Sequence, residues 1–200
     1  SLKKYNEAEK TFKNVTALKP TAEHYYIYGN IHKQLQNFNE AMKAFEDAIN
    51  LKPDYSDAFN NLGNIKKKLG FTNEAIENYK NAINTRKNNL QAYFNLAHLY
   101  NEEKKFEELK KVLKKVLNLD ENNTTALNDL GYLNLILGNI DEGRRLFEKV
   151  LNIDDKHIRA FKNYFLITKV NNENKYLHKL EKLDLSNISD EDKIFAFTSL

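Results

Sequence analysis

Residues 22–55 read AEHYYIYGNIHKQLQNFNEAMKAFEDAINLKPDY, and residues 56–89 copy this stretch as SDAFNNLGNIKKKLGFTNEAIENYKNAINTRKNN. Further copies begin at Leu90, Thr124 and Ile158, and the last copy is degenerate. Two sets of residues recur every 34 positions: Gly29, Gly63, Ala97 and Gly131, and Ala41, Ala75, Leu109 and Gly143. A fixed period of this length predicts a solenoid, in which each unit buries its apolar face against its neighbours.

Each repeat divides into two helices with a short break between them. In the first full repeat we expect helices at about residues 22–35 and 38–51, separated by Gln36-Asn37. The breaks of the second and fourth repeats contain Gly70 and Gly138, which can take the left-handed conformation that ends a helix. A break this short predicts that the two helices fold back as an antiparallel hairpin.

Apolar and small residues recur at fixed positions of these helices. Large apolar residues form a column on the first helices: Tyr25, Phe59, Tyr93, Leu127 and Phe161. Four residues later a second column consists of the small residues Gly29, Gly63, Ala97 and Gly131, and we expect a neighbouring helix backbone to pass close to them. The fifth repeat has Phe165 at the small position, which predicts a looser last hairpin.

These residues resemble the pattern of the tetratricopeptide repeat family. In the first full repeat the matching residues are Tyr25, Tyr28-Gly29, Ala41, Phe45, Ala48 and Pro53, and in the second they are Phe59, Leu62-Gly63, Ala75, Tyr79 and Ala82. The resemblance covers about residues 5–170. It implies an all-α, right-handed superhelical solenoid of antiparallel helix hairpins, with a concave groove lined by the first helices where protein or peptide ligands bind.

The expected domain organisation follows the repeats. About five repeats follow a half repeat at residues 1–21, and their bounds are 22–55, 56–89, 90–123, 124–157 and a degenerate 158–170. Residues 171–200 are expected to form a C-terminal helical cap or the start of a linker to a further domain. Because the chain opens inside a repeat and closes inside a helical pattern, we expect it to be a fragment of a longer protein.

The composition restricts the classes of partner. The 200 residues include 31 Lys and Arg and 28 Asp and Glu, a net charge of +3 that is too small to predict nucleic-acid or membrane binding. No apolar run approaches the roughly 18 residues of a membrane span. The absence of cysteine excludes disulfides and thiolate metal sites and is compatible with a reducing compartment, so a cytoplasmic location is expected.

The sequence offers no recognisable catalytic arrangement. Its histidines are not spaced for a metal site with one another or with a carboxylate, and no glycine-rich phosphate loop occurs. We therefore expect no catalytic residue, no metal and no cofactor in this chain.

The candidate ligand-binding residues lie on the first helices, at positions that the core does not use. One column consists of Asn61, Asn95, Asp129 and Asn163. Asn and Asp are mediocre helix formers, so their recurrence in mid-helix needs a reason. Amides spaced one per repeat could bind the backbone of an extended peptide, since each has donors and an acceptor. The column resembles the asparagine ladder in the repeats of O-linked N-acetylglucosamine transferase. The alternatives are an interhelix hydrogen bond at each repeat junction, or mere abundance of asparagine.

Two further columns complete the expected groove. Side-chain contacts to a ligand are predicted for Asn30, Asn64, His98 and Tyr132. Tyr26 and Phe94 are candidate apolar anchors, because aromatic rings bury a large area at little cost in rotamer entropy. In the fifth repeat, Arg159 and Lys162 share a helical face that could hold an acidic ligand segment or remain a solvated basic surface.

The function predicted from this pattern is a protein–protein interaction scaffold that binds an extended peptide or a partner helix. RNA binding is not favoured, because the groove lacks both a basic lining and a base-reading code. The alternative is an accessory substrate-binding region of a larger transferase, either a glycosyltransferase or a sulfotransferase. Residues 176–197 weakly resemble the segment that joins bacterial repeats of this family to a sulfotransferase domain.

Overall fold

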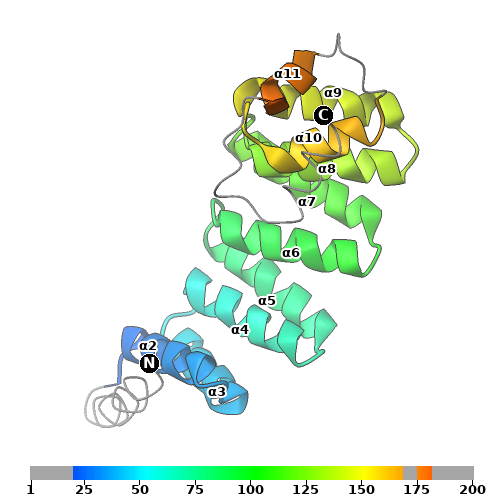
Figure 1. The fold of residues 1–200 in the computed structure, drawn as a ribbon. Helices are drawn as coiled ribbons and strands as arrows, with labels where there is room; N and C mark the ends of the chain where they lie inside the picture. The colour runs from blue at the N-terminus through cyan, green and yellow to red at the C-terminus, as the bar shows by residue number, and fades with distance from the viewer. Residues whose placement is uncertain (1–19, 169–174, 182–200) are drawn as a thin grey trace. The chain divides into compact units, whose positions relative to one another are not determined.

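A computed structural model describes residues 20–168 and 175–181 of the chain (Figure 1). All regular secondary structure in these residues is helical, so the predicted all-α repeat fold is confirmed. The half repeat expected at 1–21 lies almost entirely outside the described residues, as does most of 171–200. None of the described helices is both long and apolar enough to cross a lipid bilayer.

The chain forms two compact units, which are described separately, and the division falls between the two helices of the third repeat. Unit 1 extends to Lys105 and contains α2 (Ala22–Gln34), α3 (Phe38–Leu51), α4 (Ser56–Lys68), α5 (Thr72–Thr85) and α6 (Leu90–Glu102). Unit 2 begins at Phe106 and contains α7 (Phe106–Leu119), α8 (Thr124–Ile136), α9 (Ile140–Ile153), α10 (Ile158–Phe165) and α11 (Lys175–Glu181). Within each unit the two helices of a hairpin pack side by side: α2 with α3 and α4 with α5 in unit 1, and α8 with α9 in unit 2.

The turns inside the hairpins share one backbone conformation. Gly70 and Gly138 have φ angles of +83° and +80°, which confirms the left-handed turn predicted there. At the equivalent positions Gln36 and Lys104 adopt φ angles of 60° and 54° without the help of glycine. The turn geometry is therefore kept where glycine is absent, at some local cost because a side chain crowds the carbonyl in this region.

The small column on the first helices accommodates aromatic rings of the second helices. A Cβ atom built at each glycine would lie only 2.6–2.7 Å from a ring carbon of its own repeat. The pairs are Gly29 with Phe45, Gly63 with Tyr79, and Gly131 with Phe147. The expectation that a helix backbone passes close to these glycines holds only in part. The nearest atoms belong to fully buried rings, but at Gly63 the Ala75 carbonyl oxygen of α5 would also lie 3.3 Å from an added Cβ atom.

A buried polar chain joins neighbouring repeats of unit 1. Asn89 caps the start of α6, where its Oδ1 accepts from the backbone N–H of Ala92 at 3.1 Å. Its Nδ2 donates to the Ser56 hydroxyl at 2.7 Å, and that hydroxyl donates to the Ala82 carbonyl at 2.7 Å. These bonds connect the N-terminal ends of α4 and α6 to the end of α5, and so set the positions of two helices that carry candidate ligand-binding residues.

The fifth repeat departs from the others at its first helix. α10 has 8 residues, whereas α8 has 13, and it ends at Phe165. Phe165 occupies the position that is small in the other repeats. Its ring is buried and packs against Tyr164, with ring centroids 5.4 Å apart. α11 then packs against α10 and α9. The ring of its buried Tyr176 lies 4.9 Å from the Tyr164 ring of α10, and Lys179 donates to the Leu151 carbonyl of α9.

Candidate functional site

The predicted ligand-binding residues of unit 1 lie together on its first helices, α2, α4 and α6. Hydrogen bonds connect them from helix to helix, and we call this set the first-helix network. Its members are Tyr26, Asn30, Lys33, Asn60, Asn61, Asn64, Gln91 and Asn95.

Asn61 joins α4 to α2. Its Nδ2 atom donates to the Tyr26 hydroxyl at 3.2 Å and to Asn30 Oδ1 at 3.1 Å. Lys33 Nζ donates to Asn61 Oδ1 at 3.1 Å, and partial burial lowers the pKa of Lys33. Three polar groups of α2, the Tyr26 hydroxyl, Asn30 Oδ1 and Lys33 Nζ, are therefore all hydrogen-bonded to the Asn61 carboxamide.

Asn95 repeats this arrangement one repeat later, between α6 and α4. Its Nδ2 atom donates to Asn60 Oδ1 at 2.9 Å and to Asn64 Oδ1 at 3.0 Å, while Gln91 donates to Asn95 Oδ1 at 3.1 Å. Asn64 Oδ1 also accepts from the Tyr79 hydroxyl at 2.9 Å. The asparagine column thus makes the interhelix hydrogen bonds that were the alternative interpretation of its recurrence.

The network still leaves hydrogen-bonding capacity for a ligand. Asn61 Oδ1 and Asn95 Oδ1 each accept one bond, and an amide oxygen has two lone pairs. Asn64 Nδ2 has no hydrogen-bond partner among the described residues. The network can therefore offer acceptors and a donor to a peptide backbone without breaking any interhelix bond.

The predicted aromatic anchors of unit 1 are packed against their hairpins. Tyr26 is half-buried, and its ring lies 4.9 Å from the ring of Tyr55 and 5.8 Å from that of Phe45. Phe94 is also half-buried. Each ring therefore presents only part of its surface to a ligand.

His98 lies in a charged group that the sequence interpretation missed. Lys67 Nζ is 2.8 Å from Glu102 Oε2 and 3.2 Å from His98 Nδ1, and the His98 ring is exposed. The hydrogen bond from Lys67 lowers the pKa of Glu102. The spacing of His98 and Glu102, four residues apart on one helix, was the available signal for this group.

Unit 2 repeats this interhelix bond at the same two positions of the repeat. Asn163 Nδ2 donates to Asn128 Oδ1 at 3.0 Å, which joins α10 to α8. Asp129 Oδ1 lies 3.5 Å from the guanidinium of Arg159, so the basic residue expected to hold an acidic ligand is already paired. Lys162 is half-buried, and Tyr132 exposes 46% of its surface.

The buried phenol of Tyr79 makes the stability of the protein depend on pH in the alkaline range. Burial raises its pKa to about 12, and the charge of Glu102 adds to the shift. An unfolded tyrosine ionises near pH 10, so the stability that the neutral phenol contributes is present below pH 10 and is lost as the pH rises towards 12. We expect the free energy of unfolding to fall more steeply between these pH values in the wild type than in Tyr79→Phe, as measured by urea denaturation. Equal slopes would contradict this, because Tyr55 and Tyr93 are present in both proteins.

No group of three or more histidines and carboxylates in the described part of the chain could hold a metal ion. The residues brought together here are amides, phenols and isolated ion pairs. Their chemistry suits hydrogen bonding to a peptide.

Known families and structures resemble this chain along most of its length. The tetratricopeptide repeat model matches residues 56–89, 90–123 and 124–157, and a related repeat model matches 29–70. The curated proteins give no match.

Several solved structures share the fold. The crystal structure of MamA has a TM-score of 0.69 at 20% identity and covers 76% of this chain and 90% of its own. The structure of YrrB, described as a TPR protein with an unusual peptide-binding site, has a TM-score of 0.67 at 22% identity. The match covers 94% of this chain and 96% of YrrB. MamA from Desulfovibrio magneticus RS-1 has a TM-score of 0.63 at 15% identity and covers 73% and 82%. These matches include neither a glycosyltransferase nor a sulfotransferase, so they lend no support to the transferase alternative.

Proposed function

Because the chain belongs to the tetratricopeptide repeat family, we propose that it is a protein-interaction module whose first helices bind an extended peptide of a partner protein. The observation that carries this proposal is the first-helix network. It holds one carboxamide per repeat in a fixed orientation, with Asn61 Oδ1, Asn95 Oδ1 and Asn64 Nδ2 available to a ligand.

Preorganisation is the physical advantage of this arrangement. A free asparagine loses rotamer freedom when it binds a ligand, whereas these side chains are already held by bonds to the next helix. An extended peptide presents alternating N–H and C=O groups along its length, and the amide oxygens and Asn64 Nδ2 match those two kinds of group. The resulting grip depends on the peptide backbone and only weakly on its sequence.

Side chains beside the network would supply selectivity. In unit 1, Asn30 and His98 provide polar contacts, and the partly exposed rings of Tyr26 and Phe94 provide apolar ones. In unit 2 the corresponding surface consists of Asp129, Tyr132, Arg159, Lys162 and Asn163. The fold shared with YrrB, itself described as having a peptide-binding site, supports a peptide ligand.

The sharpest test replaces Asn64 by aspartate. This change keeps the oxygen that accepts from Asn95 and Tyr79, removes the unpartnered donor and adds a negative charge. Peptides selected from a random dodecapeptide library on the wild-type protein should bind Asn64→Asp about tenfold more weakly, which corresponds to about 1.4 kcal/mol. Asn50→Asp makes the same charge change at an exposed position of α3 and should bind as the wild type does.

A second variant separates binding from folding. Asn61→Ala/Asn95→Ala removes bonds between helices as well as ligand contacts, so we expect unfolding to require about 0.5–1.5 kcal/mol less free energy for each lost hydrogen bond. Peptide affinity should fall as well. Wild-type affinity in both Asn64→Asp and this double variant would show that the asparagine column is purely structural.

A further inference from the structure

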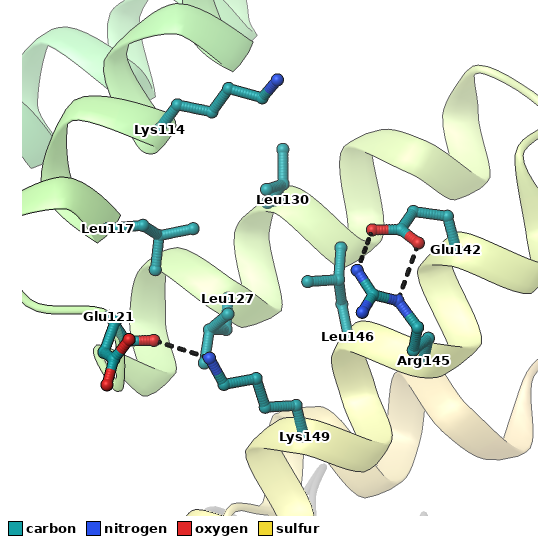
Figure 2. A pocket seen from close by; sticks show the side chains of 9 residues that line it. All are labelled: Lys114, Leu117, Glu121, Leu127, Leu130, Glu142, Arg145, Leu146 and Lys149. Atoms are coloured by element: carbon teal, nitrogen blue, oxygen red, sulfur yellow. Dashed lines mark hydrogen bonds and ion pairs between the residues drawn. The ribbon is translucent and has the colours of Figure 1, made fainter.

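Unit 2 contains a pocket lined by residues of α7, α8 and α9 and of the loop after α7, none of which belongs to the first-helix network. The pocket has a volume of about 310 Å³ and opens between α7 and α9, with part of α8 behind it (Figure 2). Four leucines line its apolar part, and they are Leu117, Leu127, Leu130 and Leu146. The polar lining consists of Lys114, Glu121, Glu142, Arg145 and Lys149. Figure 2 shows the leucines around a common space, with Lys114 and the Arg145–Glu142 pair on different sides of it.

One residue of the lining departs from the repeat pattern. Leu127 stands where the other repeats have an aromatic ring, at Tyr25, Phe59, Tyr93 and Phe161. A leucine side chain is smaller than a phenylalanine ring, so the fourth repeat does not fill the position that an aromatic residue fills elsewhere. The volume of about 310 Å³ is at the small end of the roughly 300–1,000 Å³ that ligand pockets occupy. It therefore suits a single large apolar side chain.

The charges around the pocket select the kind of ligand. Arg145 is paired with Glu142 by two hydrogen bonds of 2.9 and 2.8 Å, and Lys149 donates to the Glu121 carbonyl at 2.9 Å. Lys114 has no hydrogen bond or ion pair to another described residue. It belongs to a run of lysines on α7 that also includes Lys110, Lys111 and Lys115, with no acidic residue between Leu109 and Leu119.

These lysines are uncompensated within the described part of the chain, since no side chain of the run has an ion pair there. Two repeats earlier, the positions of Lys114 and Arg145 hold Glu46 and Glu77. One repeat earlier both positions hold lysine, Lys80 and Lys111, so the positive charge is shared with the preceding repeat but is not a feature of every repeat.

We propose that the pocket is a second docking site, for an acidic peptide segment of a partner protein that inserts one leucine, isoleucine or phenylalanine side chain. The leucines bury the inserted side chain, and a flanking aspartate or glutamate pairs with Lys114 at the rim. A nucleic acid fits less well, because the lining has no aromatic ring on which a base could stack. This site is independent of the peptide site proposed on the first helices.

Two variants and one matched control test the proposal. Leu127→Phe restores the ring found in the other repeats and narrows the pocket, whereas Lys114→Glu reverses the charge of an exposed side chain at its rim. Lys115→Glu makes the same charge change on the same helix at an exposed residue that does not line the pocket. The probe is a library of random dodecapeptides, selected on the wild-type protein and counter-selected on Leu127→Phe.

We expect the selected peptides to carry an aliphatic or phenylalanine residue next to aspartate or glutamate. Their affinity should fall about tenfold in Leu127→Phe and in Lys114→Glu, and less than about threefold in Lys115→Glu. Asn64→Asp should leave their affinity unchanged, which separates this site from the one on the first helices. If Leu127→Phe does not fold by circular dichroism, the comparison of Lys114→Glu with Lys115→Glu decides the result.

Three outcomes would overturn the proposal. One is a selection that yields no peptide sensitive to Leu127→Phe or to Lys114→Glu. Another is equal loss of binding in the two lysine variants with full binding in Leu127→Phe, which would assign a general surface for polyanions, including nucleic acid. The third is concentration-dependent dimerisation of the wild type that Leu127→Phe abolishes, which would assign the pocket to a second copy of the chain.

Discussion

Replacing Phe45 by alanine should reduce the free energy of unfolding by about 3–5 kcal/mol. The Phe45 side chain is fully buried in a cluster with Ala41, Ala48 and Leu62, and its ring covers Gly29. Truncation removes this apolar surface and leaves a cavity that the rigid hairpin can only partly close. Urea denaturation followed by circular dichroism measures the change.

Phe71→Ala is the matched control, because it removes the same ring from a position that is 48% exposed. We expect a loss of less than about 1 kcal/mol there, since surface substitutions have small effects. Comparable losses in the two variants would show that the ring beneath Gly29 is not a principal part of the core of the first full repeat.

Gly63→Ala should cost about 1–3 kcal/mol, although alanine is the better helix former. The new Cβ atom would lie 2.7 Å from Tyr79 Cε1 and 3.3 Å from the Ala75 carbonyl oxygen. Tyr79 is fully buried and its hydroxyl is bonded to Asn64, so the ring cannot move away freely. The clash therefore outweighs the gain of roughly 1 kcal/mol in helix propensity.

The third repeat suggests how to test this explanation. Its residues at the same two positions are Ala97 and Leu113, a larger residue on the first helix and a smaller one on the second. The variant Gly63→Ala/Tyr79→Leu should therefore lose less stability than the sum of the two single variants, as a double-mutant cycle measures. Strict additivity would mean that contact between these two side chains is not the cause of the destabilisation.

Periodicity was sufficient to predict the hairpins, because the repeated turn residues mark where each helix ends. The second helix of the first full repeat was expected at 38–51 and is found at Phe38–Leu51. The reason for the recurring glycines was harder to predict, because the ring that approaches Gly63 comes from a residue 16 positions later, on another helix. Phe165 was visible in the sequence as a break in the pattern and predicted a looser last hairpin, but the shortening of α10 to 8 residues was not predicted.

At the candidate site, recurring residue types in the sequence predicted which residues share a helix face but not how their side chains are oriented. The sequence indicated that Asn61 and Asn95 share a face, but not which way their amides point, and the direction decides whether a proton is left for a ligand. The useful donor is Asn64 Nδ2, which belongs to the neighbouring column. The pairing of Arg159 with Asp129 likewise depends on the distance between two helices.

The most direct test of the proposed function follows the side-chain amide resonances of Asn61, Asn64 and Asn95 by NMR while a library-selected peptide is added. We predict that the Asn64 resonances shift most, with smaller changes at Asn61 and Asn95 and none at Asn50 on α3. Binding that leaves these three amides unchanged and shifts resonances of α3 or α5 instead would contradict a peptide site on the first helices.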